Sequence, residues 1–186
     1  MKRCFDVLFS IVALIIAAIP SGLLAIIIFV TSGTPIVYWG QRVGRDNRLF
    51  MMPKFRSMRQ GAPTVSTECL RHPRFWVTPV GSFMRKFSLD EIPQLWSILK
   101  GDMSFVGPRP ALVVEELLIT ERAKYRVNEV TPGLTGWAQV NGRDGLSVQE
   151  KVQFDVEYIK HRSFFFDLKI LFKTLAIVVT GAGISH

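Results

Sequence analysis

Apolar and polar positions are unevenly distributed along the chain, and the longest uncharged apolar block runs from Val7 to Val30. As one helix this block would be about 36 Å long, enough to cross a bilayer core of about 30 Å. Pro20 and Ser21 lie inside it. Proline removes a backbone donor and clashes with the preceding turn, and a serine hydroxyl can satisfy a freed carbonyl in lipid. The pattern predicts two helical arms that meet at a break at Pro20 and Ser21.

Positive charges flank this block on both sides. Lys2 and Arg3 precede it, and a group of basic residues from Arg42 to Arg56 follows it. Positively charged flanks favour the cytoplasmic side of a membrane. A re-entrant segment, which enters and leaves by the same face, satisfies both flanks, whereas a single span satisfies one. We therefore expect residues 1–34 to form a re-entrant membrane segment, with a single span as the alternative. A cleaved signal peptide fits less well, because the apolar run is long and lacks a clear cleavage site.

The remaining chain, residues 35–186, alternates shorter apolar patterns with turn residues, which predicts a second domain facing the cytosol. The fold class is mainly α with a small β-hairpin. Ser147 and Glu150 have the spacing of a helix capping box. The expected elements are strands at 36–43 and 49–58 around a turn at 44–47, a surface loop at 60–72, and helices at 88–99, at 110–130 and from Ser147.

The run from Phe164 to Val179 is strongly apolar and carries Lys169 and Lys173 four residues apart. This pattern is typical of an amphipathic helix in a membrane interface, with its lysines extended toward lipid phosphates. A buried helix of the core is the alternative.

The composition shows that this apolar chain is also strongly basic. The chain of 186 residues is 48% hydrophobic and has a formal net charge of +8. Two cysteines exclude a disulfide framework, and three scattered histidines exclude the usual zinc spacings. The combination indicates a basic protein in contact with anionic membrane lipids.

Candidate chemistry lies between Arg85 and Pro110, where Asp90 and Glu91 are adjacent at the start of a predicted helix. One interpretation is structural, because Ser88 and Glu91 have capping-box spacing and acidic residues suit a first helical turn. The other is functional, because a carboxylate held at a helix start can act as a nucleophile. Adjacent helical side chains point about 100° apart, so the second carboxylate could hold a cation such as Mg²⁺.

Arg109 stands between Pro108 and Pro110, which restrict the backbone on both sides of its guanidinium. This would present a rigid clamp for phosphate, although an ordinary turn with an exposed arginine has the same sequence. Arg85 and Lys86 lie just upstream of the carboxylates. Together with the apolar segment, these features predict phosphoryl transfer at a bilayer surface.

Ordered motifs run along nearly the whole chain and resemble those of the bacterial sugar transferases known as small monotopic phosphoglycosyl transferases. The principal stretches are Lys2-Arg3-x-Phe5-Asp6, Gln41-Arg42-Val43-Gly44, Lys54-Phe55-Arg56-Ser57-Met58, Thr78-Pro79-Val80-Gly81, Ser88-Leu89-Asp90-Glu91-Ile92-Pro93-Gln94-Leu95, Gly101-Asp102-Met103-Ser104-Phe105-Val106-Gly107-Pro108-Arg109-Pro110, Pro132-Gly133-Leu134-Thr135-Gly136-Trp137-Ala138-Gln139-Val140-Asn141-Gly142-Arg143 and Asp155-Val156-x-Tyr158.

The resemblance implies an enzyme that transfers a phosphosugar from a UDP-sugar to undecaprenyl phosphate, releases UMP and so initiates glycoconjugate assembly. It implies that Asp90 is the nucleophile of a covalent intermediate, that Glu91 binds Mg²⁺, and that Arg109 and Arg85 receive phosphate. It also implies a place at the cytoplasmic face of a bacterial inner membrane, without nucleic acid as a partner, and it admits a homo-oligomer.

Further substrate-binding residues follow from the same resemblance, namely Lys54, Arg56, Gln139, Asn141, Arg143, Asp155 and Tyr158. Gln139 and Asn141 have a structural alternative, in which they satisfy backbone groups of a loop. The sugar stays open, with an N-acetylhexosamine somewhat favoured over galactose or glucose. The alternative function is a membrane-anchored basic binding or scaffold protein.

Overall fold

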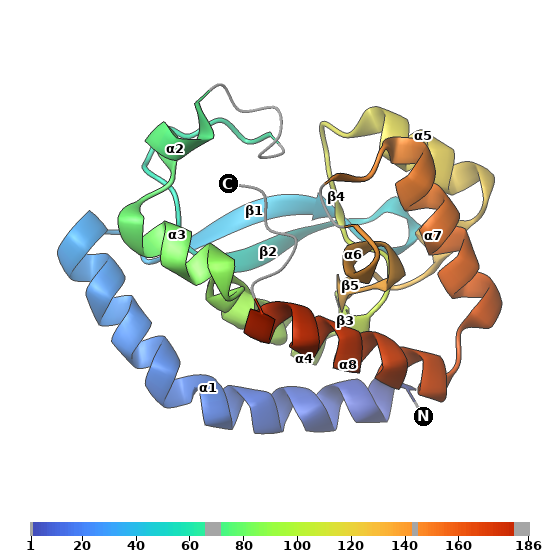
Figure 1. The fold of residues 1–186 in the computed structure, drawn as a ribbon, viewed down its shortest axis with the longest axis horizontal. Helices are drawn as coiled ribbons and strands as arrows, with labels where there is room; N and C mark the ends of the chain where they lie inside the picture. Colours follow the sequence, from blue (N-terminus) through green and yellow to red (C-terminus); the bar gives the residue numbers. More distant parts are fainter. Residues whose placement is uncertain (1, 66–71, 143–144, 181–186) are drawn as a thin grey trace.

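A computed structural model describes residues 2–65, 72–142 and 145–180 of the chain. Its longest element is helix α1 (Lys2–Ser32), which passes through Pro20 and Ser21 without interruption. The helix bends along its length (Figure 1). The expected break is therefore a bend in one continuous helix, which is how a helix accommodates an internal proline when most of its other backbone bonds persist. By length and composition α1 is able to cross a membrane.

Both ends of α1 are tied to the rest of the protein. Near its start, Arg3 donates to the carbonyls of Ile98 and Leu99 at 2.5 and 2.7 Å. At its end, Arg56 donates to the carbonyl of Ser32 and, at 2.6 Å, to that of Gly33. The side of α1 that meets the protein contributes buried residues along its length, while its other side is apolar and exposed, with Ile19 78% exposed.

The predicted β-hairpin is confirmed. Strands β1 (Val37–Val43) and β2 (Leu49–Phe55) pair antiparallel around a short turn, η1 (Arg45–Asn47). A short strand, β4 (Ala111–Leu112), pairs with the other side of β1, so the sheet has the order β2-β1-β4. A separate parallel pair joins β3 (Ser104–Val106) to β5 (Gly133–Thr135).

Two of the predicted helices differ from the sequence pattern. The segment expected as a helix at 88–99 is a 3₁₀ turn, η3 (Leu89–Gln94), followed by α4 (Leu95–Lys100), since Pro93 interrupts the α-helical bonding. The segment expected at 110–130 begins with β4 and contains only a short α5 (Glu116–Lys124) before η4 (Val127–Glu129). The predicted loop at 60–72 lies partly outside the described residues and is followed by α2 (Pro73–Trp76) and α3 (Pro79–Lys86).

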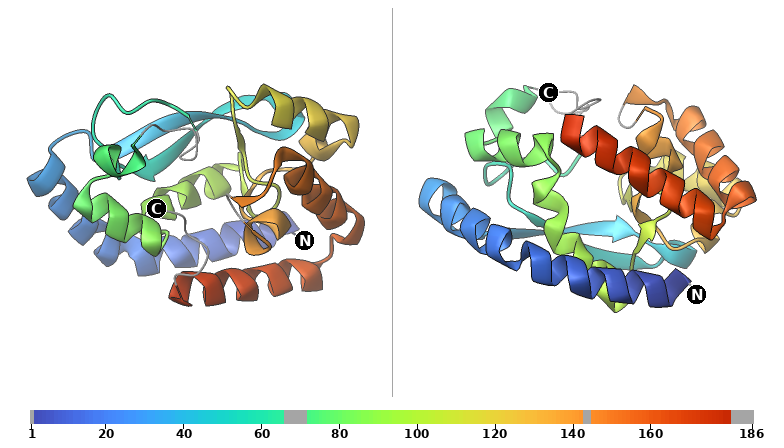
Figure 2. Two further views of the ribbon diagram at one scale, coloured as in Figure 1. Left: turned by 45° about the horizontal axis from the view of Figure 1, so that its top comes forward. Right: turned by 60° about the horizontal axis from the view of Figure 1, so that its bottom comes forward.

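The C-terminal helices agree with their patterns. After the short α6 (Trp137–Val140), α7 (Val148–His161) begins with the predicted capping box between Ser147 and Glu150. Helix α8 (Phe164–Thr180) follows, and Figures 1 and 2 show it running in the same general direction as α1, from the end of the molecule that carries the N-terminus. One face of α8 is buried at Ile170, while Phe165 is 81% exposed.

Lys169 and Lys173, predicted to extend toward lipid phosphates, lie over the ring of Trp137 at 5.5 and 4.7 Å from its centre. Lys2 forms an ion pair with Asp167 at 2.5 Å, and the rings of Phe5 and Phe164 meet edge to face. The two apolar helices are thus joined at their N-terminal ends, and both expose apolar side chains. These exposed faces associate the protein with a membrane.

Candidate functional site

The candidate site is built on one face of the β2-β1-β4 sheet. Alternate residues of a strand share a face, so Tyr38, Gly40 and Arg42 of β1 point to the same side. Lys54 of β2 is directly opposite Tyr38 and shares this side. We call this side of the sheet the inner face. It lies between η3, which packs on β2, and the Pro108-Arg109-Pro110 segment, which leads into β4.

Asp90 and Glu91 are placed above the inner face by η3. Glu91 Oε1 accepts from Lys54 Nζ and from Arg109 Nη2, each at 2.7 Å. Asp90 is 6% exposed. Ser88 adopts a left-handed conformation with φ of 55° and its side chain does not cap the turn, so the predicted capping box with Glu91 is wrong, although both acids do lie in the first turn of η3. We refer to Lys54, Asp90, Glu91 and Arg109 as the carboxylate–cation cluster.

The two carboxyl groups have opposite electrostatic surroundings. Burial raises the pKa of Asp90, the positive charge of Lys54 opposes this shift, and the negative charge of Glu91 adds to it. Burial would also raise the pKa of Glu91, but Arg109 and Lys54 hold that pKa well below its usual range. Glu91 is therefore firmly ionised, while Asp90 is the more basic carboxyl. Adjacent acids with different pKa values are suited to different roles.

Arg85 and Arg109 add positive charge at Asp90, because each lowers the pKa of this carboxyl. Arg85 belongs to the last turn of α3, which comes immediately before η3. The structure thus brings together five of the residues expected at the site. They are Lys54, Arg85, Asp90, Glu91 and Arg109.

Arg42 is a member of the site that sequence reasoning counted only as a flanking charge. Burial and the neighbouring Arg109 lower its pKa, while Glu115 and Glu91 act in the opposite direction. Its Nε is buried and has no hydrogen-bond partner among the described residues. The motif Gln41-Arg42-Val43-Gly44 contained the signal, but no local pattern placed this arginine beside the carboxylates.

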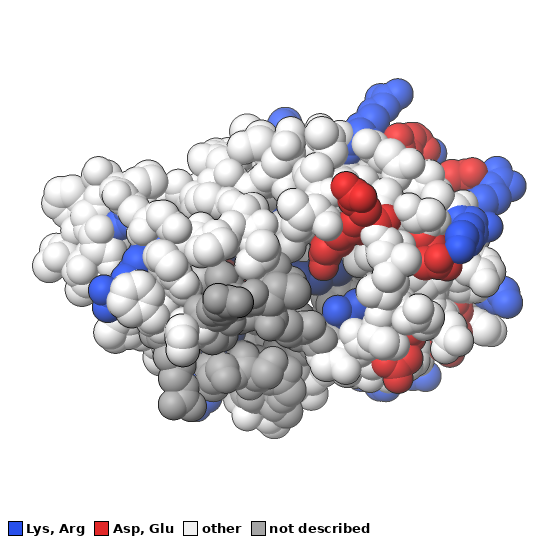
Figure 3. All heavy atoms as spheres, turned by 90° about the horizontal axis from the view of Figure 1, so that it is seen from above, with Lys and Arg blue, Asp and Glu red and all other residues white. Residues whose placement is uncertain are grey.

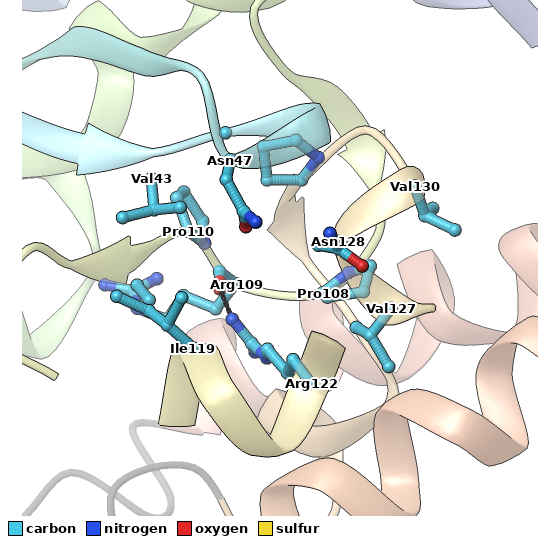
Figure 4. A pocket seen from close by; sticks show the side chains of 13 residues that line it. Val43, Asn47, Pro108, Arg109, Pro110, Ile119, Arg122, Val127, Asn128 and Val130 are labelled. Carbon is cyan, nitrogen blue, oxygen red and sulfur yellow. Dashed lines mark hydrogen bonds between the residues drawn. The ribbon is translucent and has the colours of Figure 1, made fainter. Parts of the chain in front are cut away.

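Behind Arg109, a buried ion pair fixes the backbone. Arg122 donates to Asp155 at 2.7 and 2.9 Å, and its Nη1 donates to the carbonyl of Arg109 at 2.7 Å. Figure 4 shows this last bond beside a small cavity that Arg109, Arg122 and Asn128 help to line. Asp155 is 1% exposed. Asp155, predicted to contact substrate, pairs with Arg122 and through it positions the backbone of Arg109.

Three other predicted substrate contacts have structural partners. Arg56 binds the end of α1, and the Tyr158 hydroxyl donates to Asp167 at 2.9 Å inside the core, so neither reaches the carboxylate–cation cluster. Asn141 Nδ2 donates to the carbonyl of Trp137 at 2.7 Å, as its structural alternative predicted. Each of these side chains is held by partners that do not belong to the carboxylate–cation cluster.

The other two predicted contacts stay undecided. Gln139 is 9% exposed, and its amide atoms have no partner among the described residues. Arg143 lies outside the described residues. Figure 3 shows Lys and Arg side chains inside a hollow of the upper surface, with Asp and Glu side chains beside it.

The residues present are compatible with Mg²⁺ only in part. Among the described residues, no group of three or more acidic, histidine or cysteine side chains gathers to hold a metal ion. Mg²⁺ commonly binds one or two carboxylates together with substrate phosphates and water. Adjacent Asp90 and Glu91 meet that lesser requirement, so a metal here would depend on oxygen atoms from a bound phosphate.

Comparison with known proteins identifies the family of this chain. Residues 1–181 match the family model of the bacterial sugar transferases. The chain is 38% identical to the uncharacterized sugar transferase EpsL of Bacillus subtilis (strain 168), over all of this chain and 91% of that protein. It is 39% identical to the undecaprenyl-phosphate galactose phosphotransferase of Salmonella typhimurium, over 98% of this chain and 41% of that protein.

A similar partial match, 34% identical over 98% of this chain and 44% of the relative, is to the UDP-N-acetylgalactosamine-undecaprenyl-phosphate N-acetylgalactosaminephosphotransferase of Aeromonas hydrophila. The chain thus spans less than half the length of these two relatives. The fold, the site and these matches define a transferase enzyme. The chain belongs to the bacterial sugar transferase family, as its motifs implied.

Proposed function

We propose that this protein transfers a sugar phosphate from a UDP-sugar to undecaprenyl phosphate and releases UMP. The observation that carries the proposal is the carboxylate–cation cluster, in which a buried, basic carboxyl stands beside an ionised one and is surrounded by Lys54, Arg85 and Arg109. Cations arranged in this way stabilise a diphosphate and its leaving group. The names of the Salmonella and Aeromonas relatives supply the acceptor and the class of sugar.

In the proposed reaction, an Asp90 oxygen attacks the phosphorus that carries the sugar. The bond from this phosphorus to the bridging oxygen breaks, and UMP leaves with the electron pair. An oxygen of the lipid phosphate then attacks the phosphorus of the aspartyl phosphosugar, the bond to Asp90 breaks, and the free carboxylate returns. The raised pKa of Asp90 makes this carboxylate more basic, which favours nucleophilic attack.

The proposal includes Mg²⁺, which Glu91 would hold together with phosphate oxygens of the donor. The metal would supply positive charge to neutralise the diphosphate. Glu91 suits this role because it stays ionised, and Arg109 and Lys54 would still neutralise substrate oxygens around it.

We further propose that the protein lies in one leaflet at the cytoplasmic face of the inner membrane. Two contacts support this arrangement. Arg3 ties the start of α1 to α4, and Arg56 ties the end of α1 to β2, so both ends of the helix meet the same folded body. A helix that crossed the bilayer would separate these ends by the thickness of the hydrocarbon core.

The test of the reaction is release of UMP from UDP-sugars by the detergent-purified protein, with and without undecaprenyl phosphate. Asp90→Asn should abolish turnover, because the amide is a poor nucleophile. Without lipid, the intact mass of the wild type should increase by one phosphosugar, and the variant should show no increase. Asp46→Asn is a matched control, since Asp46 is exposed and pairs with its neighbour Arg45 and not with the carboxylate–cation cluster. Turnover of Asp90→Asn at the wild-type rate would contradict the covalent mechanism.

A further inference from the structure

An aromatic side chain lies on the inner face without a described role. Tyr38 is 44% exposed, although it shares this face with Gly40, which is buried, and Arg42. Its neighbour across the sheet is Lys54, which binds Glu91. Tyr38 therefore lies directly across the sheet from Lys54, a member of the carboxylate–cation cluster, and its side chain is partly accessible to a ligand.

The position of Tyr38 in the sheet makes it part of the floor of the site. Strand β1 is central in the order β2-β1-β4. The carboxylates of η3 lie over β2 on one side, and the Arg109 segment enters β4 on the other. The floor between these walls consists of Tyr38, Gly40 and Arg42, and side chains two positions apart on a strand are about 7 Å apart. Arg42 and Tyr38 thus leave the strand at opposite ends of this floor, and the Tyr38 ring leans over Gly40 toward Arg42.

Gly40 lets the ring lie along the strand. A Cβ atom at position 40 would lie 3.0 Å from Cε1 of Tyr38 and 3.6 Å from its Oη. These distances mean that the hydroxyl-bearing part of the ring rests against the backbone of Gly40. Tyr38 is 44% exposed, so it keeps accessible surface beyond this contact, and any larger residue at position 40 would push the ring away from the strand.

We propose that Tyr38 is the platform on which the pyrimidine base of the nucleotide donor stacks. This inference rests on the proposed function, in that the donor is a nucleotide sugar. The diphosphate would bind Arg42 and Arg109, and the base would lie against the Tyr38 ring, which leans over Gly40. Stacking of a base on an aromatic ring contributes to affinity without hydrogen-bonding to its edges.

The experiment is equilibrium binding of UMP to the 186-residue protein in detergent, measured by calorimetry. Tyr38→Ala should raise the Kd for UMP about tenfold. Tyr38→Phe, which keeps the ring, should stay near the wild-type value, and Tyr38→Leu, which keeps an apolar side chain without a ring, should resemble Tyr38→Ala. Ribose 5-phosphate lacks the base and should bind the wild type and Tyr38→Ala equally.

Trp39→Ala is the matched control. Trp39 is 48% exposed and adjacent to Tyr38, but the alternation of the strand points it to the opposite face. Its replacement should leave UMP binding unchanged. A second arm uses Gly40→Ala, which should weaken UMP binding when Tyr38 is present and have no further effect in the Tyr38→Ala background. Such a double-mutant cycle isolates the contact between the two positions.

Each result decides the proposal. Equal UMP binding by the wild type and Tyr38→Ala would overturn the stacking role while leaving the proposed transfer reaction intact. A loss of affinity confined to the UDP-sugar, with UMP unaffected, would assign the ring to the sugar and also overturn it. Failure of the wild type itself to bind UMP would overturn the nucleotide donor and the platform together.

Discussion

At the scale of single residues, Asp90 and Glu91 show how neighbours in sequence acquire different chemistry. Both lie in η3 and are withdrawn from solvent. Glu91 makes direct ionic contacts with Lys54 and Arg109. The positive charge of Lys54 lowers the pKa of Asp90 through space, without a direct hydrogen bond. Burial therefore dominates at Asp90 and ionic pairing dominates at Glu91. The difference arises from the partners that the sheet and the Arg109 segment supply.

The pH dependence of kcat/KM tests this balance. In the proposed mechanism only ionised Asp90 attacks, so activity should fall as the pH drops through its pKa, which burial raises. Lys54→Met removes a charge that lowers this pKa, and the acidic limb of the profile should move to higher pH. Lys54→Arg keeps the charge and should leave the limb in place. A limb that moves to lower pH in Lys54→Met would contradict the assignment.

The Arg122–Asp155 pair gives a prediction about stability. Removal of one partner leaves a buried charge unpaired, so Asp155→Asn or Arg122→Met should each lower the free energy of unfolding by about 3–5 kcal/mol. The double variant Arg122→Met/Asp155→Leu should recover part of this loss, because no charge then stays buried. Urea unfolding measures the effect. A stable Asp155→Asn protein with a raised KM for the donor would restore Asp155 as a substrate contact.

At the scale of elements, local patterns predicted what local physics determines. Alternating apolar residues around a turn gave the β-hairpin, and Ser147 with Glu150 marked the start of α7 correctly. The prediction of one α-helix at 88–99 was wrong, because Pro93 and the left-handed Ser88 favour a 3₁₀ turn despite the helical periodicity of the segment. Likewise, β4 is two residues long, and only its pairing with β1 makes it a strand.

For the site, too, the sequence predicted some residues correctly and left the surroundings of others undetermined. Asp90, Glu91 and Arg109 were found because their residue types suggest chemistry, and the resemblance added Lys54. Arg56, Tyr158 and Asp155 were assigned to the substrate, and the structure gives each of them a partner within the protein. Their partners lie 23, 9 and 33 positions away along the chain, and a motif does not reveal whether a side chain faces a ligand or another element.

Arg56 offers a prediction at this scale, because it joins two elements. Arg56→Met removes the charged donors for the last carbonyls of α1, and each such bond contributes about 1.5–3 kcal/mol. We expect a lower thermal midpoint and faster proteolysis near Gly33, with an unchanged KM for the UDP-sugar. Arg109→Met is the contrasting variant and should raise that KM. An Arg56→Met protein that is stable but binds the donor poorly would place Arg56 in the site.

At the scale of the whole molecule, α1 is attached to the folded body at both of its ends and exposes an apolar side between them. The N-terminal end of α8 is attached in a similar way, because Asp167 of α8 forms an ion pair with Lys2 of α1. An apolar surface shared by two helices on one body is suited to one leaflet of a bilayer.

Labelling of single cysteines tests this topology. In a Cys69→Ser background, native Cys4, which is exposed near the start of α1, should react with an impermeant maleimide only after the inner membrane is opened. Thr31→Cys, at the other end of α1, in a protein that also lacks Cys4, should behave identically. Ile16→Cys, on the exposed apolar side, should stay unlabelled in both conditions. Labelling of either end from outside intact cells would contradict the one-leaflet arrangement.

The clamp of Arg56 on Ser32 and Gly33 has a geometric consequence. Only residues 33–36 separate the end of α1 from β1, and β1 carries the floor of the site. The depth at which α1 rests in lipid therefore sets the height of Asp90 above the hydrocarbon. In the proposed reaction, the headgroup layer would hold the acceptor phosphate at a nearly constant level, close to that of Asp90. The search for the acceptor would then be reduced from three dimensions to two.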